Sequence, residues 1–161
     1  MLTQERLKEQ LSYDPETGHF TQILRTSQRV KVGDRAGSQD PRGYRLINIC
    51  GRREWEHRLV WLYIYGVFPD FDIDHINGNK SDNRLCNLRA ASRSENNCNS
   101  VIRSDSTTKY RNVHLFKRTG KYQVQVRFNG KRYNGGYYDT AEQANIIAIA
   151  MRKQLHGEFA K

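Results

Sequence analysis

The spacing of hydrophobic residues changes along the chain, and each spacing predicts a different element. Near the start, Leu7 and Leu11 lie four residues apart and follow Thr3, which can cap a short helix. An Asp-Pro-Glu-Thr-Gly turn comes next, and residues 19–24 then have the composition of a strand. The chain therefore begins with a short helix, a turn and a strand.

Residues 31–43 are rich in Gly, Asp and Pro, which predicts a loop. Residues 44–50 alternate between apolar and polar side chains. Gly51 and the arginines after it can turn the chain into a partner strand around residues 54–56. This pattern is typical of a small antiparallel sheet.

The most apolar stretch is HRLVWLYIY, at residues 57–65. A buried strand and a buried helix are both compatible with it. A helix is favoured, because Gly66 stands where a glycine commonly ends a helix and Pro69 follows. Its apolar positions nearly encircle it, so we expect it to be the core around which the first hundred residues pack.

A strand, a loop, a strand and a helix are predicted between residues 73 and 99. Residues 73–76 form the first strand and residues 85–90 the returning one. Ser92 and Glu95 make a capping box that opens a polar helix to about residue 99. The asparagines of the intervening loop are interpreted as turn formers: Asn77, Asn79 and Asn83.

After residue 108 the pattern predicts three strands and a helix. The strands are residues 111–116, 122–128 and 131–138, with Asn129-Gly130 as a hairpin turn. A helix capped at Thr140 then runs to about His156. Alternation turns one set of side chains toward that helix, namely Val124, Val126 and Phe128, against Ala144, Ile147, Ala148 and Met151. The predicted class is α+β.

Composition favours several small cores and a polyanionic partner. Apolar residues make up 37% of 161 residues, which is low for one large core. The net charge is +10, but residues 1–100 contribute only +2 and residues 101–161 contribute +8. Aromatic residues are interleaved with this basic segment, a combination typical of nucleic-acid binding.

Other classes are disfavoured. No run of 18 apolar residues is present, and the first eleven residues are polar and charged, so we expect neither a membrane span nor a secretory signal. Cys50, Cys86 and Cys98 show no C-x-x-C spacing, which argues against a disulfide framework and a zinc knuckle. Three buried free thiols and a cytoplasmic location are the expectation.

Four polar residues are candidates for one site. Asp74 and His75 are adjacent at a strand end, Asn87 follows His75 by 12 residues, and Asn96 follows Asn87 by nine. The segment HRLVWLYIYG…DHINGNKSDNRLCNLRAASRSENN resembles the HNH endonuclease module of bacteriophage homing and freestanding nucleases. The resemblance covers about residues 44–99 and implies a ββα-metal fold, two antiparallel strands and a helix around one divalent ion.

The resemblance also implies a role for each residue. Asp74 would bind the metal, His75 would be the general base, and Asn87 would orient His75. Asn96 would replace the family's commoner third His as a metal ligand, with Asn97 as the competing candidate. Carboxylate and amide oxygens suit Mg²⁺ or Mn²⁺, one per site, better than zinc.

A phosphate clamp is a further hypothesis. Arg93, in the first turn of the predicted helix, can hold a phosphate through its fork of donors, and Arg84 and Arg89 are alternatives. His57 begins the apolar segment and is interpreted as a packing residue, or as one that supports the ligands, rather than as a ligand.

Residues 109–160 resemble the DNA-binding domain of plant ethylene-response factors, through YR-x-V, the GKY strand, GYYDTAEQA and the closing HGEFA. The resemblance implies a three-stranded sheet in the major groove, backed by a helix. The family's sheet tryptophans are absent, so individual base contacts do not transfer. Candidate DNA contacts are Arg111, His114, Lys117, Arg118, Gln123, Gln125, Arg127 and Arg132.

Together these features predict a two-module, monomeric enzyme that nicks double-stranded DNA with some sequence preference and needs no protein partner. The modules are an HNH domain at residues 1–99, with its ββα-metal core at about 72–99, and a DNA-binding domain at 109–161, joined by a linker at 100–108. The alternatives are a non-catalytic DNA-binding protein with a degenerate nuclease fold and, on charge alone, an RNA-binding protein.

Overall fold

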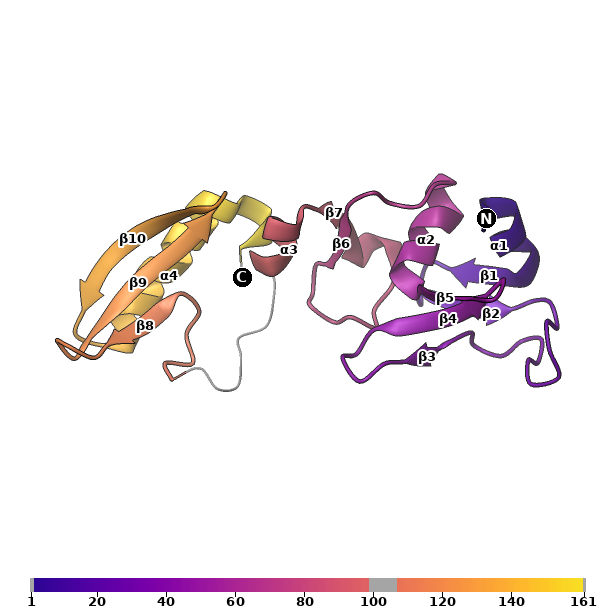
Figure 1. Cartoon of the computed structure of the whole chain (residues 1–161), viewed down its shortest axis with the longest axis horizontal. Helices are drawn as coiled ribbons and strands as arrows, with labels where there is room; N and C mark the ends of the chain where they lie inside the picture. Colours follow the sequence, from indigo (N-terminus) through magenta and orange to yellow (C-terminus); the bar gives the residue numbers. More distant parts are fainter. Residues whose placement is uncertain (1, 99–106, 161) are drawn as a thin grey trace. The chain divides into compact units, whose positions relative to one another are not determined.

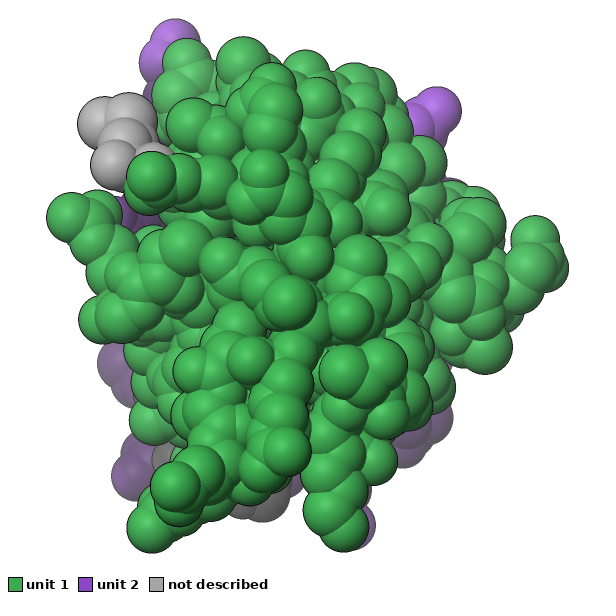
Figure 2. All heavy atoms as spheres, turned by 90° about the vertical axis from the view of Figure 1, so that its right-hand side faces the viewer, with its two compact units in different colours: residues 1–91 green, residues 92–161 purple. Residues whose placement is uncertain are grey.

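Short helices and small antiparallel sheets alternate along the chain, in the order drawn in Figure 1. The computed structural model describes residues 2–98 and 107–160. Its contacts divide the chain into two compact units, residues 1–91 and 92–161, coloured separately in Figure 2. The mixture confirms the predicted α+β class.

Unit 1 opens with α1 (Gln4–Gln10), whose first turn is capped by the Thr3 hydroxyl accepting from the Arg6 N–H at 3.4 Å. Leu11 was expected to continue this helix. It instead has extended backbone and begins β1 (Leu11–Asp14), which pairs antiparallel with β2 (His19–Gln22). The turn at residues 14–18 brings the two segments together, and Leu11 is buried in this arrangement.

A second sheet has the order β3-β4-β5, from β3 (Ser38–Gln39), β4 (Arg45–Ile49) and β5 (Arg52–Trp55). The short strand β3 lies in the segment that was predicted to be loop. Helix α2 (Glu56–Tyr65) follows β5 directly and ends at Gly66, whose φ of 79° is left-handed, as the sequence predicted.

Helix α2 supplies the centre of the unit 1 core. Leu59, Val60 and Leu62 are at most 2% exposed and belong to one cluster with Leu7 and Phe20. The helix therefore joins the N-terminal hairpin to the rest of the unit, which confirms the expectation that it forms the core.

The last hairpin of unit 1 pairs β6 (Asp72–His75) with β7 (Leu88–Ala91). The returning strand was predicted to begin at residue 85. Residues Leu85–Asn87 instead form a 3₁₀ turn, η1, and the pairing starts at Leu88 opposite His75.

Unit 2 begins with α3 (Arg93–Cys98), and its predicted capping box is present. The Ser92 N–H donates to Glu95 Oε2 at 2.7 Å, and the Glu95 N–H donates to Ser92 Oγ at 3.3 Å. The predicted linker at 100–108 falls mostly on residues 99–106, outside those the structure describes. Thr108 is buried and donates to the Val113 carbonyl, so it belongs to unit 2. The domain limits at 99 and 109 stay a prediction.

A three-stranded sheet and one helix form the rest of unit 2. Strands β8 (Val113–Phe116), β9 (Lys121–Phe128) and β10 (Lys131–Tyr138) have the order β10-β9-β8. Helix α4 (Ala141–His156) packs on them, with Val124, Ala144 and Ala148 fully buried between, and η2 (Gly157–Phe159) closes the unit. A side chain at Gly135 would meet Met151 at 2.5 Å, so a glycine there lets β10 approach the helix.

Cys50 and Cys86 are free but exposed, so the prediction of buried thiols is wrong for both; Cys50 lies in the β4–β5 turn with a positive φ of 49°. Among the described residues, no helix has the length and apolar character needed to cross a membrane.

Candidate active site

Strand β6 places Asp74 and His75 side by side, and both are buried, at 3% and 4% exposure. Neighbouring side chains on a strand point to opposite faces. Asp74 accordingly meets Arg89 of the partner strand, while His75 meets the loop between β6 and β7 and the rings of Tyr44 and His57. The adjacent pair thus has two separate surroundings.

A chain of buried polar contacts holds the His75 ring. Asn83 Oδ1 lies 3.1 Å from His75 Nε2, and Asn83 Nδ2 donates to Glu56 Oε2 at 2.9 Å. Glu56 Oε2 in turn lies 2.9 Å from Arg45 Nε in an ion pair. Asn83 is 1% exposed and Glu56 is fully buried.

This chain assigns the tautomer of His75. Because the Asn83 amide nitrogen donates to Glu56, its oxygen faces the ring and accepts a hydrogen bond from Nε2. In the neutral imidazole the lone pair then lies on Nδ1. The interpretation of Asn83 as a turn former was wrong: it is the link between a buried carboxylate and the imidazole.

The N-terminal hairpin fixes Asn83 from the other side. The Tyr13 hydroxyl donates to the Asn83 carbonyl at 2.9 Å, and burial raises the pKa of Tyr13 to about 12, so it remains a donor at neutral pH. A side chain at Gly18 would lie 2.3 Å from the Arg84 nitrogen and 2.6 Å from the Asn83 carbonyl carbon. The glycine therefore lets the β1–β2 turn pack directly against the backbone of the site.

Aromatic rings surround His75 on another side. The ring centroids of Tyr44 and His57 lie 6.0 Å and 5.3 Å from its own, and Trp55 stacks on His57 at 6.2 Å. Burial lowers the pKa of His75, against the opposing effects of the Asn83 hydrogen bond and the Asp74 charge. Burial and the neighbouring His75 lower the pKa of His57 to about 3. Both imidazoles are therefore neutral at pH 7.

Asp74 is engaged in an ion pair across the hairpin. Arg89 Nε and Nη2 lie 2.8 Å and 2.7 Å from Asp74 Oδ2, and the two residues are register partners. A metal at Asp74 would have to share or replace this pair. Arg84, the other alternative for a phosphate clamp, forms a bidentate pair with Asp82 and lowers the pKa of the Asp82 carboxyl to about 2.

Asn87 was predicted to orient His75, but the bond that holds the ring comes from Asn83. The Asn87 side chain instead closes the loop after β6. Its Oδ1 accepts from the Asn77 N–H at 3.0 Å, and its Nδ2 donates to the Asp82 carbonyl at 2.8 Å. Asn87 therefore fixes the loop that carries Asn83.

The other predicted site residues, Asn96 and Arg93, lie on α3 in unit 2; Asn96 is half-buried and Arg93 is exposed. Their part in a site with Asp74 stays a prediction. Within the described residues, no group of three or more His, Cys, Asp and Glu side chains is arranged to hold a metal ion. The predicted donor set is one carboxylate and one amide oxygen, completed by water, so it does not require three such side chains.

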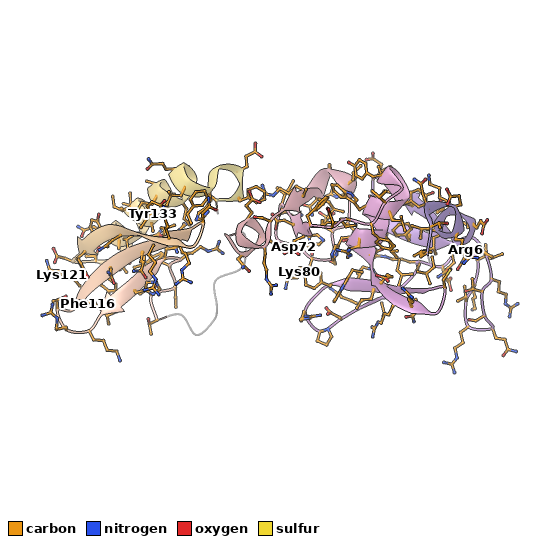
Figure 3. The ribbon with its side chains drawn as sticks, turned by 45° about the horizontal axis from the view of Figure 1, so that its top comes forward. Arg6, Asp72, Lys80, Phe116, Lys121 and Tyr133 are labelled. Carbon is orange, nitrogen blue, oxygen red and sulfur yellow. The ribbon has the colours of Figure 1, made fainter. Side chains whose placement is uncertain are left out.

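Most of the predicted DNA contacts share the face of the unit 2 sheet opposite α4. The register aligns His114 with Gln123 and Arg127 with Arg132, and Gln125 lies between these pairs on the same face of β9. Phe116 pairs with Lys121 at the end of this face (Figure 3), and the Arg118 guanidinium lies 5.5 Å from the Phe116 ring. Lys117 lies in the same turn, and Arg111 precedes β8 and accepts from Arg152 through its carbonyl.

A family model described as HNH endonuclease matches residues 54–98. The chain carries an HNH endonuclease domain. Asp74, His75, Asn83 and Glu56 lie within that segment. Three residues that support the site, Tyr13, Gly18 and Arg45, precede it, so the HNH domain depends on the N-terminal hairpin and on β4 for its geometry.

Two viral proteins are similar to this chain, and one of them is described as an HNH endonuclease. Over 106 residues, 65% of this chain, it is 32% identical to Protein 3.8 of Escherichia phage T7 and spans 87% of that protein. Over 119 residues, 73% of this chain, it is 33% identical to the uncharacterized HNH endonuclease L560 of Acanthamoeba polyphaga mimivirus, of which it spans 61%. A solved structure of the HNH homing endonuclease I-HmuI, in a study of DNA binding and cleavage, aligns with a TM-score of 0.43 and 18% identity over 91% of this chain and 85% of that one.

The predicted HNH resemblance is thereby confirmed, while the resemblance of unit 2 to ethylene-response factors stays a prediction. Sequence reasoning missed Glu56, Asn83 and Arg45. Asn83 stands in a loop with three other asparagines, Asn77, Asn79 and Asn87 at its end, and nothing local distinguishes it from them. Contact with the distant β1–β2 hairpin distinguishes Asn83 from the other asparagines.

Proposed function

We propose that this protein is a divalent-metal-dependent DNA endonuclease that hydrolyses a phosphodiester bond with His75 as general base. The observation that carries the proposal is the buried, neutral His75 ring, held through Nε2 by the Asn83–Glu56 pair. A general base must be unprotonated and must keep one orientation, and both conditions are met here. The HNH domain supplies the reaction class.

In the proposed mechanism, His75 Nδ1 accepts a proton from the attacking water. Asn83 and Glu56 keep the ring from rotating and stabilise the Nε2–H tautomer as the proton arrives. Asn87 maintains the loop that carries Asn83. Arg93 would contact the phosphate that is cut, through its fork of donors.

Asp74 and Asn96 would hold one Mg²⁺ or Mn²⁺ through oxygen atoms. When bound, such an ion neutralises the charge that develops on the phosphate and on the leaving oxygen. In the protein without it, Arg89 compensates the buried Asp74 carboxylate. We therefore expect metal binding to weaken the Asp74–Arg89 ion pair.

Unit 2 would supply affinity and some sequence preference for double-stranded DNA. Its exposed sheet face carries Gln123, Gln125, Arg127 and Arg132, and Arg to guanine and Gln to adenine are pairings that such a face permits in a major groove. The excess positive charge of residues 101–161 supports the same role. One site in a monomer would cut one strand at a time.

Incubation of the protein with supercoiled plasmid and Mg²⁺, Mn²⁺ or EDTA tests the proposal. We expect nicked circles to appear before linear DNA with at least one metal, and no cleavage in EDTA. Sequencing of the ends would give the preferred site. Binding without cleavage at every metal would contradict the proposal and favour a DNA-binding protein with a degenerate nuclease fold.

A further inference from the structure

A cleft of about 490 Å³ opens in unit 1 beside the buried chain that holds His75. The β1–β2 turn, strands β2, β3 and β4, Arg35 and the loop at residues 79–84 line it, so it is built from segments far apart in the sequence. Its basic side chains are Arg35, Arg45, Arg84 and His19. It belongs neither to the exposed sheet face of unit 2 nor to the immediate surroundings of the His75 ring.

The three guanidinium groups differ in their partners. Arg45 is tied to Glu56 and to the carbonyl oxygens of Ala36 and Gly37, and Arg84 is tied to Asp82. Arg35 is exposed, and its guanidinium makes no hydrogen bond or ion pair within the described part of the chain. Arg45 and Arg84 are thus held by partners within the protein, whereas the Arg35 guanidinium is available to bind a ligand.

Arginines outnumber carboxylates in the lining of the cleft, by three to two. Glu16 and Asp82 are its acidic side chains, and Asp82 is already matched by Arg84. Burial lowers the pKa of His19, and the charges of Arg35 and Arg45 lower it further. Partial burial lowers the pKa of Arg35, and the charge of Arg45 lowers it further, against the opposing charge of Glu56. In both groups burial is the largest cause of the shift, and the neighbouring guanidinium charges add to it.

An anion is the ligand that such a cleft suits, and its volume is many times the roughly 30 Å³ that one water occupies in the liquid. The guanidinium fork binds phosphate oxygens through paired hydrogen bonds. We infer that this cleft holds a backbone phosphate of the DNA, at a position other than the bond that is cut. The inference rests on the proposed function, because it is DNA bound for cleavage that would present the phosphate.

The cleft is connected to His75 through a chain of buried polar contacts that begins at Arg45. Arg45 lines the cleft and also pairs with Glu56, which holds Asn83 and through it His75. A phosphate at Arg35 and Arg45 and the phosphate at His75 would then contact the two ends of one buried polar chain. Such an arrangement would define the direction in which the strand crosses unit 1.

Arg35→Ala tests the inference, with Arg6→Ala as the matched control. Both variants remove one exposed arginine from unit 1. Lys80 stands between the cleft residues Asn79 and Ser81, and Arg6 lies toward the opposite end of the unit (Figure 3). Affinity for a random-sequence duplex is measured in EDTA over a salt series. We expect Arg35→Ala to weaken binding about eightfold at 0.1 M salt and to reduce the slope of log K against log salt by about 0.9, the loss of one phosphate contact. Arg6→Ala should change neither quantity.

Equal affinities and slopes for the two variants would overturn the inference. Because EDTA prevents cleavage, the measurement does not depend on whether the protein cuts DNA, and the plasmid assay tests that separately. The His19 ring gives a second readout by NMR: duplex DNA should shift its signals in the wild type and not in Arg35→Ala. A shift with inorganic phosphate at the same concentration, and none with the duplex, would assign the cleft to a free anion and contradict a DNA subsite.

Discussion

The two units use polar residues in opposite ways. In unit 1 the residues of the candidate site are buried: Asp74, His75, Asn83 and Glu56 are all below 5% exposure. In unit 2 the candidate DNA contacts are exposed or half-buried on one sheet face. The charges differ as well, since residues 1–91 hold 14 basic and 12 acidic side chains, and residues 92–161 hold 13 and 5.

The difference follows from what each surface has to do. A general base works in one orientation, and burial among partners removes the alternatives, but every buried polar group then needs a partner. A surface that binds a long polyanion needs accessible donors and net positive charge, and it tolerates loose side chains. We therefore expect substitutions in unit 1 to change stability and catalysis, and those in unit 2 to change affinity.

Arg89→Leu should have the largest effect on stability. It leaves the buried Asp74 carboxylate without the arginine that now compensates it, so in EDTA the free energy of unfolding should fall by about 3 kcal/mol. Urea unfolding measures the change, and added Mn²⁺ should recover part of it if Asp74 is a ligand.

Arg84→Leu is the matched control for that change. It breaks an ion pair of similar length, but the Arg84 side chain is 45% exposed, so the loss of stability should be much smaller than for Arg89→Leu. Similar losses for the two variants would mean that burial does not distinguish the two ion pairs.

His57→Phe should abolish part of the pH dependence of folding. Burial lowers the pKa of His57 from its ordinary 6.5 to about 3 in the folded protein, so protons bind the unfolded chain more readily below pH 6.5. The native state loses stability as the pH falls through that window, by about 2.5 kcal/mol between pH 7.5 and 4.5 for this residue alone. Urea unfolding at both pH values should show that loss in the wild type and not in the variant, and parallel losses would contradict a buried neutral His57.

Asn83→Leu should release the His75 ring. The change removes both amide contacts in a buried place, which should cost about 2 kcal/mol of stability. Nitrogen NMR of the imidazole should show one tautomer, with the proton on Nε2, in the wild type and a mixture in the variant. Asn87→Leu is the comparison, and a mixture there with a single tautomer in Asn83→Leu would restore the role first predicted for Asn87.

Arg127→Ala and Arg132→Ala should have the smallest energetic effect and leave stability unchanged. Each should weaken DNA binding about eightfold at 0.1 M salt and lower the salt slope by about 0.9. Lys153→Ala removes an exposed positive charge from α4, on the other side of the sheet, and should change neither. A loss as large for Lys153 would mean that charge alone, and not the sheet face, determines binding.

Local signals predicted the elements that local chemistry determines. Gly66 marks the end of α2, the Ser92 and Glu95 pair caps α3, and Asn129-Gly130 turns β9 into β10. The start of β1 was missed, because Leu7 and Leu11 satisfy a helical spacing equally well, and pairing with β2 decides the outcome.

The candidate site likewise contains residues that local signals identify and residues that only distant contacts identify. Asp74 and His75 were found from their spacing to other polar residues, a property of the sequence. The role of Asn83 depends on Gly18 and Tyr13, more than 60 residues away, and the Asp74–Arg89 pair depends on the register of a hairpin. No pattern within a short window carries that information.

The central claim is that His75, held by Asn83 and Glu56, is the base of a DNA-cutting reaction that unit 2 assists by binding. Its most direct test measures plasmid nicking and duplex affinity on the same preparations of wild type and His75→Ala, with Mg²⁺ or Mn²⁺. We predict that His75→Ala lowers the nicking rate by about 10²- to 10⁴-fold and leaves the affinity within about twofold. Nicking by His75→Ala at the wild-type rate would contradict the account.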